Sequence, residues 1–181
     1  YFKPNGKVPA KKEGWRTMPE SNLDLLPEWF FSVTADDCLI AVDAATGKVK
    51  WHAVEKNEGH NRLGHKRGHW GVAPVVADGR VFSLGSAGML YAYDAKTGEK
   101  LWEVVAKPWL QEQLAEYKKS GKLCWNADER MSLVVAEDLV IVPHTTLRAF
   151  DVKNGGKAWT SEKRGNSARA TAILWAHNGQ E

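Results

Sequence analysis

The sequence predicts an all-β fold, a β-propeller of four-stranded antiparallel blades that forms only part of a ring. Two observations carry this prediction. A motif with an Asp, a Gly four positions later and a Trp eight positions later occurs three times, as Asp43, Gly47 and Trp51, as Asp94, Gly98 and Trp102, and as Asp151, Gly155 and Trp159. Short apolar runs recur around each motif at intervals of roughly 50 residues, which is typical of sheets stacked around an axis.

The second repeat shows all four strands of one predicted blade. Its apolar or alternating runs are residues 73–77, 80–84, 89–94 and 100–104. Asp78-Gly79 joins the first two runs and is a hairpin signal, because Gly tolerates a positive φ. Between the last two runs, Asp94 can accept backbone N–H bonds and Gly98 can take the left-handed conformation. We therefore interpret the repeated Asp and Gly residues as turn residues rather than catalytic ones.

The tryptophan of each motif predicts how the blades associate. An indole is too large for one pair of strands to cover, and truncation of a buried one costs about 3 kcal/mol or more. Each unit therefore offers an apolar face that only a neighbouring blade can bury, which favours radial stacking. Three such faces in one chain predict at least three adjoining blades.

The repeat divides the chain into an extended lead-in segment and a series of blades. The expected boundaries are 1–29 for the lead-in, 30–51 for a partial blade, 70–104 and 131–160 for complete blades, and 168–181 for the first strand of a further blade. An arc of this kind leaves unpaired strands and unburied tryptophan-bearing faces at its ends.

Composition excludes several classes of protein. The formal net charge is only +3, from 25 Lys and Arg against 22 Asp and Glu, which gives no indication of nucleic-acid binding. No apolar run approaches the roughly 18 residues of a membrane span, and no signal peptide is visible. Cys38 and Cys124 are far apart in sequence, so they permit one disulfide without requiring it. We expect Cys38 to be a small buried apolar residue rather than a redox group.

Two long connections, residues 52–71 and 106–131, are expected to lie on one face of the disc. In an up-and-down blade, the connections after the second and fourth strands share one face. The turns after the first and third strands share the other face. Because binding residues concentrate on elaborated loops, we expect any function on the face that carries the two long connections.

The first connection contains a basic, histidine-rich sequence with six candidate ligand-face residues: His60, Arg62, His65, Lys66, Arg67 and His69. The histidine spacing matches neither one helix face nor a known zinc pattern, so no residue is assigned as a metal ligand. We interpret the sequence as a solvated basic loop. The alternative is a metal or anion site completed by other blades, in which the basic side chains would suit a carboxylate or phosphate.

The second connection contains a predicted helix over residues 108–121. Pro108 suits its first turn, and Gly121 suits its end. Leu110, Leu114 and Tyr117 form one apolar stripe along it. The stripe favours packing of the helix over the rim of the propeller, and recruitment of a partner helix is the alternative.

The segments 41–51 and 92–102 share the pattern Ala-x-Asp-Ala-x-Thr-Gly-x-x-x-Trp. This pattern resembles the repeat of the pyrroloquinoline-quinone-like (PQQ-like), or quinoprotein, β-propeller superfamily. The blade pattern that starts at Trp70 most resembles extracytoplasmic propeller-repeat proteins of bacteria. The resemblance implies that the motif tryptophans dock between adjacent blades, near small residues of the third strands. It also implies more blades than this chain supplies.

The resemblance implies two alternative functions. The favoured one is a non-catalytic platform of the cell envelope, periplasmic or extracellular, that binds a protein or a small ligand. In this it would resemble the outer-membrane assembly lipoproteins. The alternative is a dehydrogenase that oxidises an alcohol or sugar with PQQ and calcium. Such enzymes commonly carry adjacent cysteines and an Asp base. This sequence has no adjacent cysteines, no Asp outside the turns that stands out as a base, and no evident cofactor site.

Overall fold

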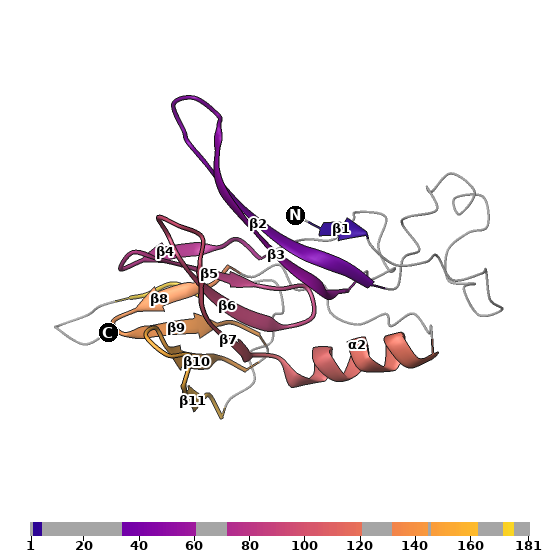
Figure 1. Ribbon diagram of the computed structural model, residues 1–181. Helices are drawn as coiled ribbons and strands as arrows, with labels where there is room; N and C mark the ends of the chain where they lie inside the picture. The colour runs from indigo at the N-terminus through magenta and orange to yellow at the C-terminus, as the bar shows by residue number, and fades with distance from the viewer. Residues whose placement is uncertain are drawn as a thin grey trace, which may run out of the picture.

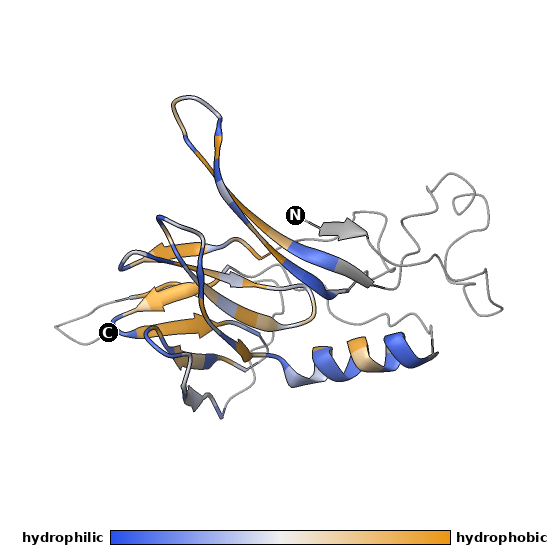
Figure 2. Cartoon of the chain, viewed as in Figure 1, coloured by the Kyte–Doolittle hydropathy of each residue, from blue (hydrophilic) through white to orange (hydrophobic). Residues whose placement is uncertain are grey.

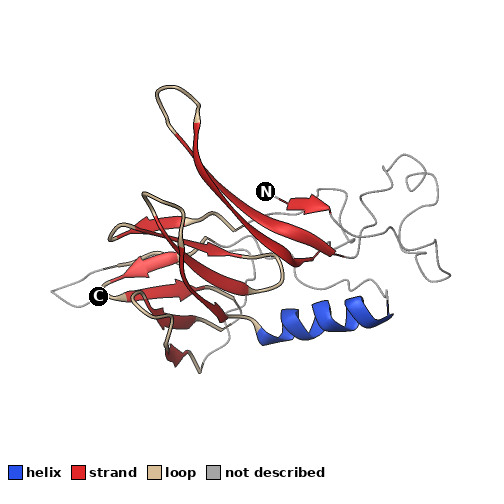
Figure 3. Ribbon diagram, in the orientation of Figure 1, coloured by secondary structure: helices blue, strands red, loops and turns tan. Residues whose placement is uncertain are grey.

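The computed structural model describes residues 2–4, 34–60, 72–120, 132–144, 146–162 and 172–175. These residues form three antiparallel sheets and one helix (Figures 1 and 3). We call them the first, middle and third sheets in chain order. The first sheet has three strands, and each of the other two has four.

The middle and third sheets are four-stranded meanders, which confirms the predicted blade. The middle sheet consists of β4 (Val75–Ala77), β5 (Arg80–Leu84), β6 (Met89–Asp94) and β7 (Lys100–Val105). The third consists of β8 (Val134–Ala136), β9 (Leu139–Val142), β10 (Arg148–Asp151) and β11 (Lys157–Thr160). In each sheet the strands pair in sequence order. Two-residue turns at Asp78-Gly79 and Glu137-Asp138 join the first two strands.

The main hydrophobic core lies between the middle and third sheets. Its buried side chains are Phe82, Leu84, Leu90, Ala92, Ala106, Leu133, Val140, Val142, Phe150 and Val152. Figure 2 shows the apolar strands of both sheets gathered in this region. The first strands of the two sheets, β4 and β8, are in contact with each other. Face-to-face sheets with adjoining first strands match the predicted arrangement of propeller blades around an axis.

The first sheet differs from the expected partial blade. It consists of β1 (Phe2–Pro4), β2 (Thr34–Val42) and β3 (Val49–His60). Residues 34–37 align with the β5–β6 turn when the repeats are superposed on their motifs, but β2 runs straight through them. The β5–β6 turn has Gly85 at its start and Gly88 at φ 85° near its end. Asp37 occupies the position that aligns with Gly88, and a residue with a Cβ adopts that left-handed geometry less readily than glycine does.

The long β2 also changes the start of the first connection. Residues 52–60 were expected to belong to a loop, yet they continue β3 as far as His60. The uninterrupted β2 supplies the pairing partner along this length. Asn57 forms a bulge at φ 60°, where its backbone N–H donates to Asp36 Oδ1 at 3.1 Å. In addition, Phe2–Pro4 of the expected lead-in pairs with β2 as a strand.

The predicted helix is present as α2 (Pro108–Ser120), between the middle and third sheets in sequence. Leu110 and Leu114 of the predicted stripe are each only 2% exposed. The Gln111 side chain donates through Nε2 to the carbonyl of Ala87 at 3.0 Å, which fixes α2 on the β5–β6 turn. Within the described ranges, no helix has the length and apolarity that crossing a membrane requires.

Candidate functional site

The described connections lie at two opposite edges of the sheets (Figure 1). The backbone N–H groups of Ala106 and Lys107 both donate to the carbonyl of Gly88 at 3.0 Å, so the start of α2 and the β5–β6 turn adjoin. We call this side, with residues 85–88 and α2, the helix edge. The motif turns at 43–47, 94–98 and 151–155 lie at the other side, which we call the turn edge.

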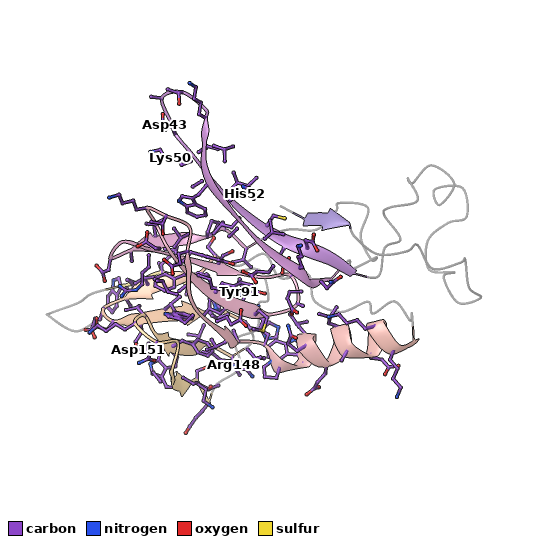
Figure 4. The ribbon with its side chains drawn as sticks, viewed as in Figure 1. Asp43, Lys50, His52, Tyr91, Arg148 and Asp151 are labelled. Carbon is purple, nitrogen blue, oxygen red and sulfur yellow. The ribbon has the colours of Figure 1, made fainter. Side chains whose placement is uncertain are left out.

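At the turn edge, the three motif carboxylates fold their own turns. Asp94 Oδ1 accepts the backbone N–H groups of Lys96 at 2.9 Å and Thr97 at 2.7 Å. Asp43 and Asp151 accept the equivalent pairs of N–H groups, at 2.8–3.1 Å. Figure 4 shows Asp43 and Asp151 in their respective turns. Each motif Asp therefore uses its carboxylate to accept hydrogen bonds from the backbone of its own turn.

Hydrogen bonds lower the pKa of two of these carboxyl groups. For Asp43 the largest cause is the Thr46 hydroxyl, and for Asp94 it is the backbone N–H of Thr97. Each group therefore stays ionised at neutral pH, as an acceptor for its turn. A permanently ionised acceptor suits a structural role better than proton transfer, which favours a pKa near the working pH.

Two motif tryptophans contact the turn of the following sheet. Trp51 Nε1 donates to the carbonyl of Ala95 at 3.0 Å, and Trp102 Nε1 donates to that of Val152 at 3.1 Å. A Cβ added at Gly98 would lie 2.6 Å from Trp51 Cδ2, and one at Gly155 would lie 2.8 Å from Trp102 Cε3. These indoles therefore lie directly on the turn glycines rather than on third-strand residues alone.

The tryptophan of the third copy of the motif and the glycine of the first copy differ from the residues that make these contacts. Trp159 remains 38% exposed. A Cβ added at Gly47 would meet nothing within 4 Å. Among the residues that the structure describes, two tryptophan–glycine contacts of the motif are thus present, at Trp51 with Gly98 and at Trp102 with Gly155.

At the helix edge, Asp37 joins the first sheet to the middle sheet. The backbone N–H of Ser86 donates to Asp37 Oδ2 at 3.0 Å, and the Ser86 hydroxyl donates to Oδ1 at 2.9 Å. Burial is the largest influence on this carboxyl and raises its pKa, although the Ser86 bonds oppose the shift. A Cβ at Gly85 would lie 2.5 Å from Asp37 Oδ2 and 3.0 Å from Tyr91 Cε2. The carboxyl and the phenol ring therefore crowd the same point of the turn.

Further charged and polar groups continue this interface. The Tyr93 hydroxyl donates to Glu55 Oε1 at 3.2 Å, and Lys100 Nζ bridges Glu55 Oε2 at 2.8 Å and Glu103 Oε2 at 2.6 Å. Burial, followed by nearby carboxylates, raises the pKa of both Tyr91 and Tyr93, so both remain neutral phenols. The contact between the first and middle sheets thus includes buried and charged polar groups beside the Trp51 ring, whereas the main apolar core lies between the middle and third sheets.

A second group of side chains lies between α2 and the third sheet. The rings of Trp109 and His144 have centroids 4.7 Å apart, and Arg148 Cζ lies 4.7 Å from the centroid of Trp109. Arg148 Nη1 also donates to the carbonyl of Ala106 at 2.7 Å. We call Trp109, His144 and Arg148 the stacked cluster. It comes from α2, the β9–β10 connection and β10, so no local spacing in the sequence could have revealed it.

The structure tests little of the predicted ligand-face sequence. The backbone of His60 ends β3, so this residue belongs to a strand rather than to the expected loop. The other five predicted residues, Arg62, His65, Lys66, Arg67 and His69, lie outside the described residues. In the part of the chain that the structure describes, no three His, Cys, Asp or Glu side chains gather where they could hold a metal ion.

A family comparison matches most of the chain. The model of a PQQ-like family, described as outer membrane protein assembly factor BamB, matches residues 25–113 and 62–178. The chain belongs to this PQQ-like β-propeller family. Its overlapping matches span the two complete blades, and the first of them includes the motif turn of the partial one.

The PQQ-like chain is similar to both kinds of protein that the sequence suggested. Quinohemoprotein alcohol dehydrogenase ADH-IIG of Pseudomonas putida is 27% identical over 104 residues, which cover 57% of this chain and 14% of that protein. BamB from Moraxella catarrhalis is structurally similar with a TM-score of 0.46 and 16% identity, over 72% of this chain and 33% of that one. Quinohemoprotein alcohol dehydrogenase from Comamonas testosteroni has a TM-score of 0.45 and 18% identity, over 71% and 18%. The chain spans a third or less of these relatives.

Proposed function

We propose that this PQQ-like chain is part of a non-catalytic binding platform of the cell envelope, periplasmic or extracellular, which presents its helix edge to a protein partner. The observation that carries the proposal is the fixed position of the stacked cluster on that edge. The family description, outer membrane protein assembly factor, supports a protein partner in the assembly of outer membrane proteins.

The geometry of the stacked cluster suits recognition of a protein. Arg and Trp are enriched at the energetic centres of protein interfaces, where fixed side chains lose little entropy on binding. Arg148 is held by the Trp109 ring and by the Ala106 carbonyl. Trp109 is anchored through α2, whose Leu110 and Leu114 are buried. The cluster therefore presents a prearranged aromatic and cationic surface.

The repeated motif supports a structural rather than a catalytic use of the blades. Its Asp residues fold turns at the opposite edge, and Trp51 and Trp102 join one sheet to the next. These contacts give the helix edge a rigid base. A rigid base improves affinity because less ordering is needed when the partner binds.

A binding experiment on the full-length protein tests the proposal. Purified proteins of the host's outer-membrane assembly machinery would be titrated against the wild type by biolayer interferometry. Trp109→Ala and Arg148→Ala should each weaken binding at least tenfold. Lys96→Ala, at the exposed turn edge, is the matched control and should leave affinity unchanged. Equal affinities for all variants, or no binding by the folded wild type, would overturn the proposal.

The similarity to ADH-IIG favours a second candidate, a PQQ- and calcium-dependent dehydrogenase of alcohols or sugars. The two candidates differ in one direct measurement. The full-length protein would be incubated with PQQ and calcium, and alcohol-dependent reduction of a dye would be followed. The platform proposal expects no PQQ-dependent rate above the protein-free control. A saturable rate with any alcohol or sugar would establish the second candidate instead.

A further inference from the structure

The turn of the third motif copy contains an asparagine where the other two copies contain a threonine. Thr46 and Thr97 occupy this position in the first two turns, and Asn154 occupies it in the third. In each turn the side-chain oxygen at this position accepts the backbone N–H two residues later, at 3.4 Å for Thr46, 3.2 Å for Thr97 and 2.7 Å for Asn154. Asn154 therefore keeps the structural role of the threonine, but a side-chain amide is chemically less durable than a hydroxyl.

The residue that follows Asn154 leaves the side-chain amide open to attack by the backbone. Asn154 is exposed, and the next residue is Gly155. Glycine has no Cβ to obstruct the approach of its own nitrogen to the preceding side chain. The other asparagine in the described part of the chain, Asn57, is followed by Glu58, whose Cβ obstructs the same approach. Among the described residues, Asn154 is thus the asparagine whose amide the backbone can reach more readily.

A hydrogen bond of the turn also activates the Asn154 amide. The backbone N–H of Gly156 donates to Asn154 Oδ1 at 2.7 Å. Attack on Asn154 Cγ would turn this oxygen into an oxyanion, and a donor that is already aimed at the oxygen stabilises the developing charge. A Cβ added at Gly156 would lie 2.8 Å from the same oxygen, so a second glycine permits this close approach.

The contact between the middle and third sheets restrains the attacking nitrogen. The backbone N–H of Gly155 donates to the carbonyl of Asp151 at 2.9 Å, in the turn that carries the Asp151 label in Figure 4. Gly155 is buried, and a Cβ there would lie 2.8 Å from Trp102 Cε3. A nitrogen held in this way cannot release its proton to solvent until the turn opens locally. The packing of Trp102 therefore determines how often the nitrogen is released.

We propose that Asn154 is a site of covalent modification by deamidation, and that the contact between Trp102 and Gly155 limits its rate. When the turn opens, the Gly155 nitrogen loses its proton to water and attacks Asn154 Cγ. The new N–Cγ bond forms, the Cγ–Nδ2 bond breaks, and ammonia leaves. Water then opens the cyclic imide at either carbonyl, which gives aspartate or isoaspartate at this position. Neither step depends on the proposed function.

Mass spectrometry of the aged full-length protein tests this modification. Chymotrypsin cleaves after Phe150 and Trp159, and the fragment between these sites has one side-chain amide, that of Asn154. After several weeks at pH 8, this fragment of the folded wild type should gain the mass difference between a carboxyl and a carboxamide group. Isoaspartyl methyltransferase should label the same fragment. Asn154→Thr restores the residue of the other two turns, so this variant should show neither change.

Two tryptophan variants test whether the sheet contact limits the rate. Trp102→Ala uncovers Gly155 and should raise the rate of modification at Asn154 at least tenfold. Trp51→Ala removes the equivalent indole from Gly98 and is the matched control, which should leave the rate within about twofold of the wild type. Circular dichroism would verify that both variants fold, and Trp102→Phe would replace Trp102→Ala if that variant did not.

Three results would overturn the inference. One is an unchanged mass of this fragment in the folded wild type after about three months. Another is the same mass gain in Asn154→Thr, since the modified atom would then lie elsewhere. The last is a rate that the folded Trp102 variant raises no more than Trp51→Ala does, because the contact would then not restrain Gly155.

Discussion

The Trp51 indole occupies the space that a side chain at Gly98 would need, since a Cβ there would lie 2.6 Å from Trp51 Cδ2. Gly98 also has a φ of 76°, which its turn requires. One glycine therefore satisfies two demands, the left-handed backbone and the close approach of an indole from the preceding sheet. Trp102, which belongs to the same copy of the motif as Gly98, makes the corresponding contact with Gly155 of the following sheet.

Comparing alanine substitutions at Gly98 and Gly47 should distinguish the cost of a positive φ from the cost of displacing the indole. Gly98→Ala adds the strain of a positive φ and displaces the Trp51 ring. Gly47→Ala adds similar strain at φ 69°, but a Cβ there meets nothing within 4 Å. We expect Gly98→Ala to lower the free energy of unfolding by about 1–3 kcal/mol more than Gly47→Ala. Urea unfolding at low protein concentration measures both, and equal losses would contradict the steric role of Gly98.

Truncation of the tryptophan between the middle and third sheets should be more damaging. Trp102 packs on Gly155 and lies 5.7 Å from the Phe82 ring, between centroids. We expect Trp102→Ala to lower the free energy of unfolding by about 3–5 kcal/mol. Trp102→Phe retains much of the apolar area but loses the bond to the Val152 carbonyl, so its loss should be smaller. Trp159→Ala is the more exposed control, and a loss as large as that of Trp102→Ala would contradict this account.

Much of the fold was predictable because its signals are local. The turn at Asp94–Gly98 depends on hydrogen bonds that span two or three residues, and the residue types of such a turn are visible in the sequence. The helix over Pro108–Ser120 likewise follows from its own first turn and apolar stripe. Elements of this kind need no knowledge of distant partners.

The first sheet was predicted less well because its shape depends on a substitution and on pairing. Asp37 aligns with Gly88 of the β5–β6 turn, yet it lies within the long strand β2, and β3 pairs along the length of that strand. The Asp37 side chain accepts a hydrogen bond from the backbone N–H of Ser86, which is 49 positions away in the sequence. The stacked cluster was missed for the same physical reason, because His144 and Trp109 meet only after three elements have packed.

Asp37 should make stability depend on pH in an unusual direction. Burial raises its pKa in the folded protein above the ordinary value of 3.8. The folded state therefore retains a proton that the unfolded state has released, and stability falls as pH rises from about 3.8 through the raised pKa. We expect Asp37→Asn to remove this fall, because the amide stays neutral and its oxygen still accepts a bond from Ser86. Urea midpoints of both proteins between pH 4 and pH 7 measure the difference.

Asp94 supplies a control of opposite sign for this pH dependence. Hydrogen bonds within its turn lower its pKa, so its contribution is complete above 3.8 and is lost as pH falls through the lowered value. Asp94→Asn should therefore change stability at neutral pH but leave the fall attributed to Asp37 intact. If Asp37→Asn retained the wild-type slope between pH 4 and pH 7, the raised pKa would not be the cause.

The attachment of α2 to the helix edge can be tested at one leucine. Leu114 is only 2% exposed, so Leu114→Ala should lower the free energy of unfolding by about 2–5 kcal/mol. Because α2 contacts the sheets through side chains of its apolar stripe, Trp109 and Gln111, the loss should also release the helix locally before the sheets unfold. Hydrogen exchange should become faster in α2 than in β5 and β6, whereas Glu112→Ala, on the exposed side of the helix, should leave both unchanged. Uniformly faster exchange throughout the chain would show instead that α2 and the middle sheet unfold as one cooperative unit.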